Sequence, residues 1–198
     1  MKKTGTKGFT TVVLLLVIVG LGYYTYLNNN IKNNRDVSKM TESEELLNYN
    51  FENDYPKTVR ETVKLHCRYL KSIYNGSFTE DELFTINKQI RQLLDDDLLA
   101  YNSEAQQLQA LEKDIQLYKD RNQKFISYSL AEASQIKYNT EDGIDYAKIK
   151  VDIAMRLDKA SVSVEEEYIL RKNKDGKWKI LGWQTVNNQT TEYKGDTD

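Results

Sequence analysis

Residues 147–157 read AKIKVDIAMRL, and this stretch decides how the second half of the chain folds. Every odd position in it is apolar, and every even position except Ala154 is charged. Strict alternation of this kind is typical of a β-strand with one face buried and the other in water. We therefore expect a strand here, with Ile149, Val151 and Ile153 facing a core.

The flanking segments continue the pattern in both directions. Between Phe125 and Tyr138 the alternation is imperfect, and the apolar residues that share parity are Ile126, Tyr128, Leu130 and Ile136. After the central stretch, Val162, Val164, Tyr168 and Leu170 alternate again, and Lys174-Asp175-Gly176 predicts a tight turn into a last strand ending near Val186. These segments predict a four-stranded antiparallel meander.

Upstream of the strands the apolar period changes to that of amphipathic helices. One stripe runs through residues 59–74 between the start signal Asp54-Tyr55-Pro56 and the stop signal Asn75-Gly76. Two more follow over residues 83–94 and 108–118, the first of them opened by the capping box Thr79-x-x-Glu82. We therefore expect an α+β domain in which three helices pack on one face of a curved four-stranded antiparallel sheet.

The start of the chain contains an uncharged run, residues 9–27, which reads FTTVVLLLVIVGLGYYTYL and follows three lysines. As a helix it would be about 28 Å long, close to the roughly 30 Å core of a bilayer. The run predicts a signal anchor whose amino-terminal side stays in the cytoplasm, with a cleaved signal peptide as the alternative. In both cases the rest of the chain is exported.

This run also sets the expected domain organisation. Residues 1–8 would be a cytoplasmic tail, 9–27 the transmembrane anchor, 28–54 a polar stalk, 55–187 the globular domain and 188–198 a flexible tail. The expected location is the cell membrane, with a single pass and the carboxy-terminal domain outside. The lipid bilayer is then one partner, through residues 9–27.

Charge and cysteine content exclude some classes of function. Residues 37–198 hold 23 basic and 29 acidic side chains, a net charge of −6, whereas nucleic-acid binding normally needs a basic face. A single cysteine, Cys67, excludes an intrachain disulfide. We therefore expect no nucleic-acid partner and a domain held together by its apolar core.

Three longer segments carry a resemblance to known families. They are residues 54–76 (DYPKTVRETVKLHCRYLKSIYNG), 79–102 (TEDELFTINKQIRQLLDDDLLAYN) and 168–184 (YILRKNKDGKWKILGWQ). The ending and the order of elements resemble the NTF2-like superfamily. The helical segments resemble an uncharacterised family of single-pass membrane proteins from clostridial Firmicutes. The resemblance implies a bent sheet wrapped around helices as a cone, with a pocket at its open end, and it implies no particular activity.

Glu166 is the first candidate for a ligand pocket. By strand parity it shares a face with Val164 and Tyr168, where its carboxylate would be desolvated and its pKa raised. In a cone, Glu166, Tyr168 and Tyr128 would be polar contacts of a small ligand. The alternative is a bulge, or a position near the end of the sheet where Glu166 reaches water.

The two tryptophans suggest a surface for a partner. Trp178 and Trp183 have opposite parity, so one should lie in the core and the other on the outer face of the sheet. Leu181 and Trp183 would then form an exposed apolar patch for a protein partner or a second copy. Plain packing against a covered edge is the alternative.

Other pairs and clusters do not support catalysis or metal binding. His66 and Cys67 are adjacent on a helix and point about 100° apart, and the residues 95–97 (DDD) fan out too widely to bind one ion. We read Cys67 as a core residue, His66 as a residue at the edge of the stripe, and residues 95–97 as a solvated helix end. No phosphate-binding, hydrolase or zinc-protease motif occurs.

The sequence therefore leads to two expectations for function. The first is a membrane-anchored extracytoplasmic NTF2-like interaction or scaffold module, without catalytic activity, cofactor or metal, that binds itself or an envelope protein. The second is a domain that binds a small molecule or a cell-wall fragment in the pocket of the cone.

Overall fold

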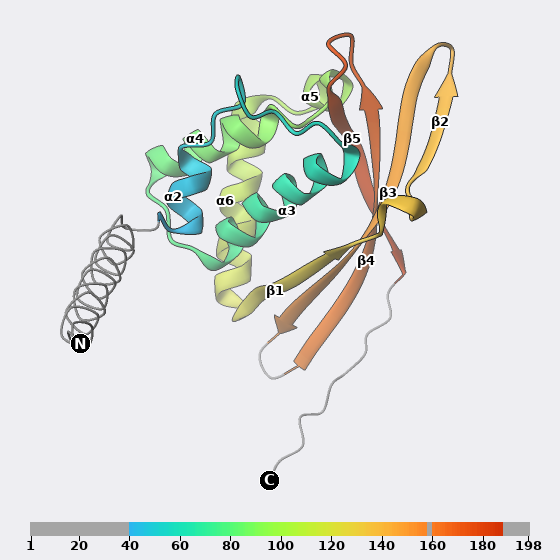
Figure 1. The fold of residues 1–198 in the computed structure, drawn as a ribbon. Coiled ribbons are helices and arrows are strands. Elements are labelled where there is room, and N and C mark those ends of the chain that lie inside the picture. The colour runs from blue at the N-terminus through green and yellow to red at the C-terminus, as the bar shows by residue number, and fades with distance from the viewer. Residues whose placement is uncertain (1–39, 158–159, 188–198) are drawn as a thin grey trace, which may run out of the picture. The chain divides into compact units, whose positions relative to one another are not determined.

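A five-stranded antiparallel sheet organises the part of the chain that the computed structural model describes, residues 40–157 and 160–187. The strand order is β1-β3-β4-β5, and β2 pairs with the first part of β3 (Figure 1). The strands are β1 (Gln123–Leu130), β2 (Lys137–Glu141), β3 (Ile144–Leu157), β4 (Ala160–Lys172) and β5 (Trp178–Asn187). Residues 147–157 lie in β3, the central strand.

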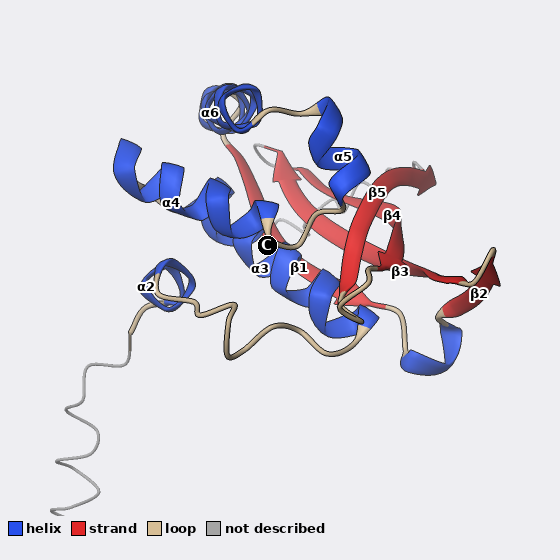
Figure 2. Ribbon diagram, turned by 90° about the horizontal axis from the view of Figure 1, so that it is seen from above, coloured by secondary structure: helices blue, strands red, loops and turns tan. Residues whose placement is uncertain are grey.

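The helices lie together on one side of this sheet (Figures 1 and 2). They are α2 (Glu42–Leu47), α3 (Val59–Asn75), α4 (Glu80–Arg91), α5 (Asp96–Tyr101) and α6 (Glu104–Asp120), with a short 3-10 turn η1 (Ala133–Gln135) between β1 and β2. Capping boxes at Thr58, Thr79 and Ser103 start α3, α4 and α6, so the predicted capping box at Thr79 is confirmed.

The core lies between α3 and the helix-facing side of β3, β4 and β5. On β3, Ala147, Ile149, Val151 and Ile153 are buried while Lys148, Lys150 and Asp152 are exposed, as the alternation predicts. On α3, the predicted core residue Cys67 is fully buried. The clearest pattern in the sequence is therefore confirmed residue by residue.

The expected fold class is wrong in its number of elements. The described residues form five strands, not four, and five α-helices, not three. Residues 125–138 are not one strand, because η1 lies between β1 and β2. After β2 the chain turns back at Asp142-Gly143, where φ is 51° and 77°. Two positive φ angles in a two-residue loop are the signature of a tight hairpin, which pairs β2 with the start of β3 as an additional strand. The four-stranded NTF2-like cone is therefore not the arrangement this chain forms.

A bulge corrects the expected parity of β1. The register with β3 shifts between Phe125 and Ser127, so Ile126 is the extra residue and remains 43% exposed. Tyr128 and Leu130 face the helices as expected, and Phe125 takes the place of Ile126 there. The imperfect alternation in the sequence reflects this insertion.

The residues 95–97 begin a helix rather than end one. The Asp95 side chain caps α5 by accepting a bond from the backbone N–H of Asp97, and it is buried against Arg171, whose Nε donates to its Oδ2 at 3.0 Å. Next to it, the backbone N–H of Asp95 donates to the carbonyl of Ile180, and the N–H of Ile180 donates to the carbonyl of Leu93. The prediction of a solvated helix end is therefore wrong for Asp95, which attaches α5 to β4 and β5.

The structure describes part of the expected stalk, whereas the expected anchor and tail lie outside the described residues. The chain divides into Met1–Thr41 and Glu42–Asp198, and residues 42–54, expected in the stalk, pack onto the core of the second unit through Leu46 and Phe51. The expected anchor at 9–27 and the tail at 188–198 lie outside the described residues. Within the described ranges, no helix has the length and apolar character to cross a bilayer. The expected membrane location therefore stays a prediction.

Candidate functional site

A buried polar cluster lies where α3 crosses β4. His66 Nδ1 is 3.2 Å from the hydroxyl of Tyr168, and both side chains are buried. The thiol of Cys67 also interacts with this hydroxyl. The two side chains are adjacent on α3, and both interact with the Tyr168 hydroxyl. The expectation that His66 lies at the edge of the apolar stripe is therefore wrong.

Burial keeps this cluster uncharged at neutral pH. It lowers the pKa of His66 to about 4 and raises the pKa of the Cys67 thiol to about 12. It also raises the pKa of Tyr168 well above its ordinary value. A cysteine nucleophile needs the thiolate, usually stabilised by a cation such as a protonated histidine. The cluster can exchange neutral hydrogen bonds, and it attaches α3 to the sheet.

Glu166 lies on the same side of β4, two residues before Tyr168. Its neighbours across the ladder are Val151 on β3 and Thr185 on β5, so it faces the helices as strand parity predicts. Burial raises the pKa of its carboxyl group, and the Tyr168 hydroxyl opposes this shift. Its Oε2 atom is buried and has no hydrogen-bond partner among the described residues.

Aromatic side chains from α3 and α6 lie near this carboxyl group. Tyr74 and Tyr118 stack with their ring centroids 4.0 Å apart. Burial raises the pKa of both phenols, and the charge of Glu166 adds to each shift. Glu166 is thus surrounded by tyrosines rather than by a basic partner.

Tyr128 lies away from the other two candidates for the ligand pocket. Tyr128 is on β1, opposite Ile153 of β3, and β3 separates β1 from β4. Together with Ser72 and Asn75 it lines a hollow of about 460 Å³ beside α3. The structure therefore brings Glu166 and Tyr168 together and leaves Tyr128 at a different place.

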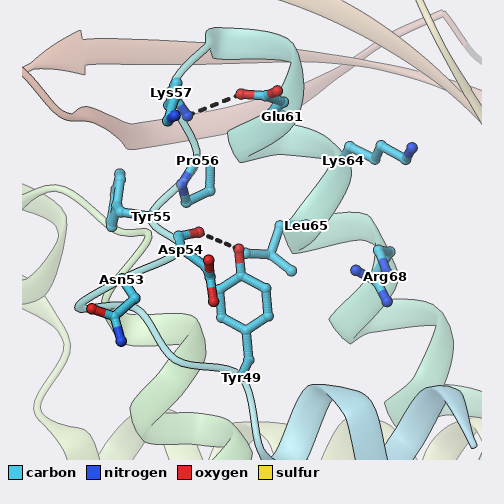
Figure 3. Close-up of a pocket in the computed structure, with 10 residues that line it drawn as sticks. All are labelled: Tyr49, Asn53, Asp54, Tyr55, Pro56, Lys57, Glu61, Lys64, Leu65 and Arg68. Carbon is cyan, nitrogen blue, oxygen red and sulfur yellow. Dashed lines mark hydrogen bonds between the residues drawn. The ribbon is translucent and has the colours of Figure 1, made fainter. Parts of the chain in front are cut away.

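A second hollow, of about 390 Å³, lies on the other side of Arg68 (Figure 3). Its walls are the segment 49–57 and α3, and Tyr49 and Leu65 are among the side chains that line it. Arg68 lines both hollows and is held by Glu42 at 2.6 Å and Glu45 at 3.0 Å. Sequence reasoning missed these hollows because it placed residues 42–54, which form part of the walls of both, in a stalk.

Trp183 faces the helices rather than the outer face of the sheet. Leu170 pairs with Ile180 and Ile169 pairs with Gly182, so Leu181 is an extra residue in β5. This bulge reverses the alternation after Ile180 and places Trp183 opposite Tyr168, with the two rings stacked at 5.7 Å. The parity argument for an outer patch of Leu181 and Trp183 is therefore wrong, although their role as a partner surface stays a prediction.

Trp183 is also a neighbour of the buried cluster. Its ring centroid lies 5.1 Å from that of His66, yet the residue remains 42% exposed. Val186, further along β5, is 43% exposed. Across the described ranges, the outer edge of β5 pairs with the backbone of residues 93–95 at Ile180, and no strand pairs with it beyond that point.

A metal centre finds no support in the described part of the chain, where no group of three or more histidine, cysteine, aspartate or glutamate side chains is placed to hold an ion.

Comparison with known proteins gives a family and weak similarity to solved structures. No curated protein matches the chain. The NMR structure of the transfer protein TraH from the Gram-positive conjugative plasmid pIP501 matches 68% of this chain and 98% of its own, at 15% identity and a TM-score of 0.35. A similarity of this size carries no conclusion about fold or function.

The family match is more extensive, since it covers residues 1–183. This chain therefore belongs to the family described as Domain of unknown function (DUF6715).

Proposed function

We propose that this protein is a binding module without catalytic activity, and that Trp183 anchors its contact with a partner protein. The observation that carries the proposal is the exposure of Trp183. Its ring is held against Tyr168 and His66, and 42% of the residue still faces solvent. Tryptophan is among the residues that most often dominate the binding energy of protein interfaces.

The surroundings of Trp183 favour binding in a second way. Its ring is already fixed by stacking, so little side-chain entropy is lost when a partner covers it. The partner could therefore gain most of the free energy of burying the exposed part of the indole.

The edge of β5 supplies a way for the partner to dock. The backbone of residues 93–95 already bonds to this edge at Ile180, and the edge from Gly182 to Asn187 continues beyond it. An extended segment of a partner could add a strand there, with main-chain bonds supplying affinity and Trp183 a side-chain contact.

The lack of catalytic activity rests on the state of the two most reactive side chains. The Cys67 thiol and the His66 imidazole are both buried and neutral at physiological pH. A substrate could not reach them without opening the core.

A site-specific cross-link tests the proposal. A photoreactive phenylalanine analogue replaces Thr185, which is exposed and lies on the same face of β5 as Trp183, and the full chain is irradiated in its native cells. We expect an adduct that disappears in Trp183→Ala. Leu117→Ala is the matched control, because Leu117 is 41% exposed on α6, and it should leave the adduct unchanged.

The mass of the adduct identifies the partner. An adduct of twice the chain mass indicates a second copy, and any other mass indicates a different protein. An adduct that persists in Trp183→Ala, or the absence of an adduct from position 185, would contradict the proposal. The unfolding midpoint of each variant in urea verifies that it is folded.

Binding of a small molecule or a cell-wall fragment is a second candidate, and the hollow lined by Tyr128 favours it. Its volume of about 460 Å³ lies within the range of about 300–1,000 Å³ that is usual for small-ligand pockets. Titration of the full chain with soluble muropeptides, followed by NMR, would test it. Unchanged signals around Tyr128 would exclude this ligand class.

A further inference from the structure

Glu166 and Trp183 are neighbours on the helix-facing side of β4 and β5. Glu166 is opposite Thr185, and Tyr168 is opposite Trp183, so Glu166 and Trp183 are diagonal partners on one face of an antiparallel pair. Such diagonal positions lie about 7–8 Å apart, within reach of a long or aromatic side chain. The register shift between Glu165 and Glu166 lies just outside this pair.

Glu166 differs from the glutamates on either side of it. Glu165 pairs with Lys150 at 2.7 Å, and Glu167 lies 3.8 Å from Lys148, both on the outer face of the sheet. No lysine or arginine in the described ranges forms an ion pair with Glu166. Its neighbours are instead the hydroxyl of Tyr168 and the aromatic pair of Tyr74 and Tyr118.

An aromatic face beside an unpaired carboxylate suits a cation. A guanidinium or ammonium group can pair with the carboxylate and also lie over the indole, where the ring quadrupole attracts it. A purely apolar ligand would leave the Glu166 carboxylate without an ionic partner, and an anion would be repelled. The excess of acidic residues in 37–198 also favours a basic partner.

We propose that the site formed by Glu166 and Trp183 binds a lysine or arginine side chain of the partner protein. This inference rests on the proposed function, because it concerns the same surface. Burial disfavours the charged form of Glu166 in the free protein, and an arriving cation favours it again.

Titration with small cations tests the inference without the partner. The full chain is labelled with 5-fluorotryptophan, and Trp183→Phe assigns the two fluorine resonances. The probes are n-butylguanidinium and n-butylammonium, with n-butanol and butyrate as neutral and anionic controls. We expect both cations to move the Trp183 resonance saturably while the resonance of the buried Trp178 does not move.

Two carboxylate variants make the test specific. Glu166→Gln keeps the shape of the side chain and should weaken cation binding at least about tenfold, which corresponds to about 1.4 kcal/mol. Glu165→Gln is the matched control, because this carboxylate already has a lysine partner on the opposite face, and it should bind as the wild type does.

The outcomes separate this inference from the proposed function. Equal shifts with n-butanol, or unchanged cation binding by Glu166→Gln, would overturn the cation site. If the cross-link from position 185 then still depends on Trp183, partner binding holds and only its cationic character is wrong. Loss of the Trp183-dependent cross-link together with intact cation binding would instead contradict the proposed function.

Discussion

His66 illustrates how the surroundings of one side chain decide its chemistry. On α3 the buried positions are not confined to one stripe, since Thr62, Leu65, His66 and Tyr69 are buried as well as Val63. This helix has the sheet on one side and other helices on the other, so more than one of its faces is covered (Figure 2). The sequence contains the apolar stripe of a helix but not the number of elements that will cover it.

The buried imidazole predicts a loss of stability in acid. In the folded protein the pKa of His66 is about 4, below its ordinary value of 6.5, so the unfolded chain binds more protons between these pH values. Stability should therefore fall as the pH drops through this window, by about 2–3 kcal/mol between about pH 7.5 and about pH 4.5. Urea unfolding at the two pH values measures it.

His66→Gln provides the comparison, because it removes this titration and should lose less stability over the same interval. Glu166 acts in the opposite direction, since its raised pKa favours the folded protein at low pH. If the variant and the wild type lost stability equally, His66 would not be the group responsible.

At the scale of elements, short connections decide where α5 and β5 lie. Asp95 is buried beneath Arg171, which also reaches Asp97 at 2.8 Å. The backbone groups of Leu93 and Asp95 also bond to the backbone of Ile180 on β5. One short segment thus attaches α5 to two strands, by a buried ion pair and by main-chain bonds.

Removing the buried partner of this ion pair should destabilise the domain. Asp95→Ala leaves the Arg171 guanidinium with a surface carboxylate alone and removes the cap of α5, so we expect a loss of about 3 kcal/mol. Asp97→Ala is the matched control: its side chain is 64% exposed, and exposed pairs contribute about 1 kcal/mol or less. Urea unfolding midpoints measure both, and equal losses would show that burial does not distinguish the two carboxylates.

At the scale of the whole molecule, one core connects α2, α3, α4 and the sheet. It includes Leu46 from α2 and Phe51 from the following segment, as well as Cys67 at the centre of α3. Since the only thiol in the chain lies inside this core, its accessibility reports on the integrity of the domain.

Cys67 should react with a thiol reagent only when the domain unfolds. The thiol is fully buried and burial raises its pKa to about 12, so both access and thiolate formation are suppressed. Labelling with an aromatic disulfide reagent across a urea series should follow the loss of tertiary structure. The variant Cys67→Ser with Ser77→Cys, whose new thiol lies at an exposed position, should react at once without urea. Comparable rates in the two proteins would mean that the core beneath α3 opens locally.

Most of the local structure follows from the amino-acid pattern. The alternation of β3, the stripe and stop signal of α3 and the capping box of α4 all depend on residues within a few positions of each other. The Asp142-Gly143 turn is readable in the same way, and it predicts a strand before it, β2, that pairs with the start of β3. The surface proposed for binding is harder to predict from the sequence, because the bulge at Leu181 inserts one residue and turns Trp183 to the other face.

Periodicity, caps and charge thus establish an α+β domain with a half-buried central strand and an acidic surface, because these features depend on near neighbours in the chain. Contacts between distant residues establish the remainder. They bury His66, leave Glu166 without a basic partner, place Trp183 beside both and bring residues 42–54 onto the core. None of these outcomes has a local signal, since each depends on the register of β4 with β5 and on which elements cover α3.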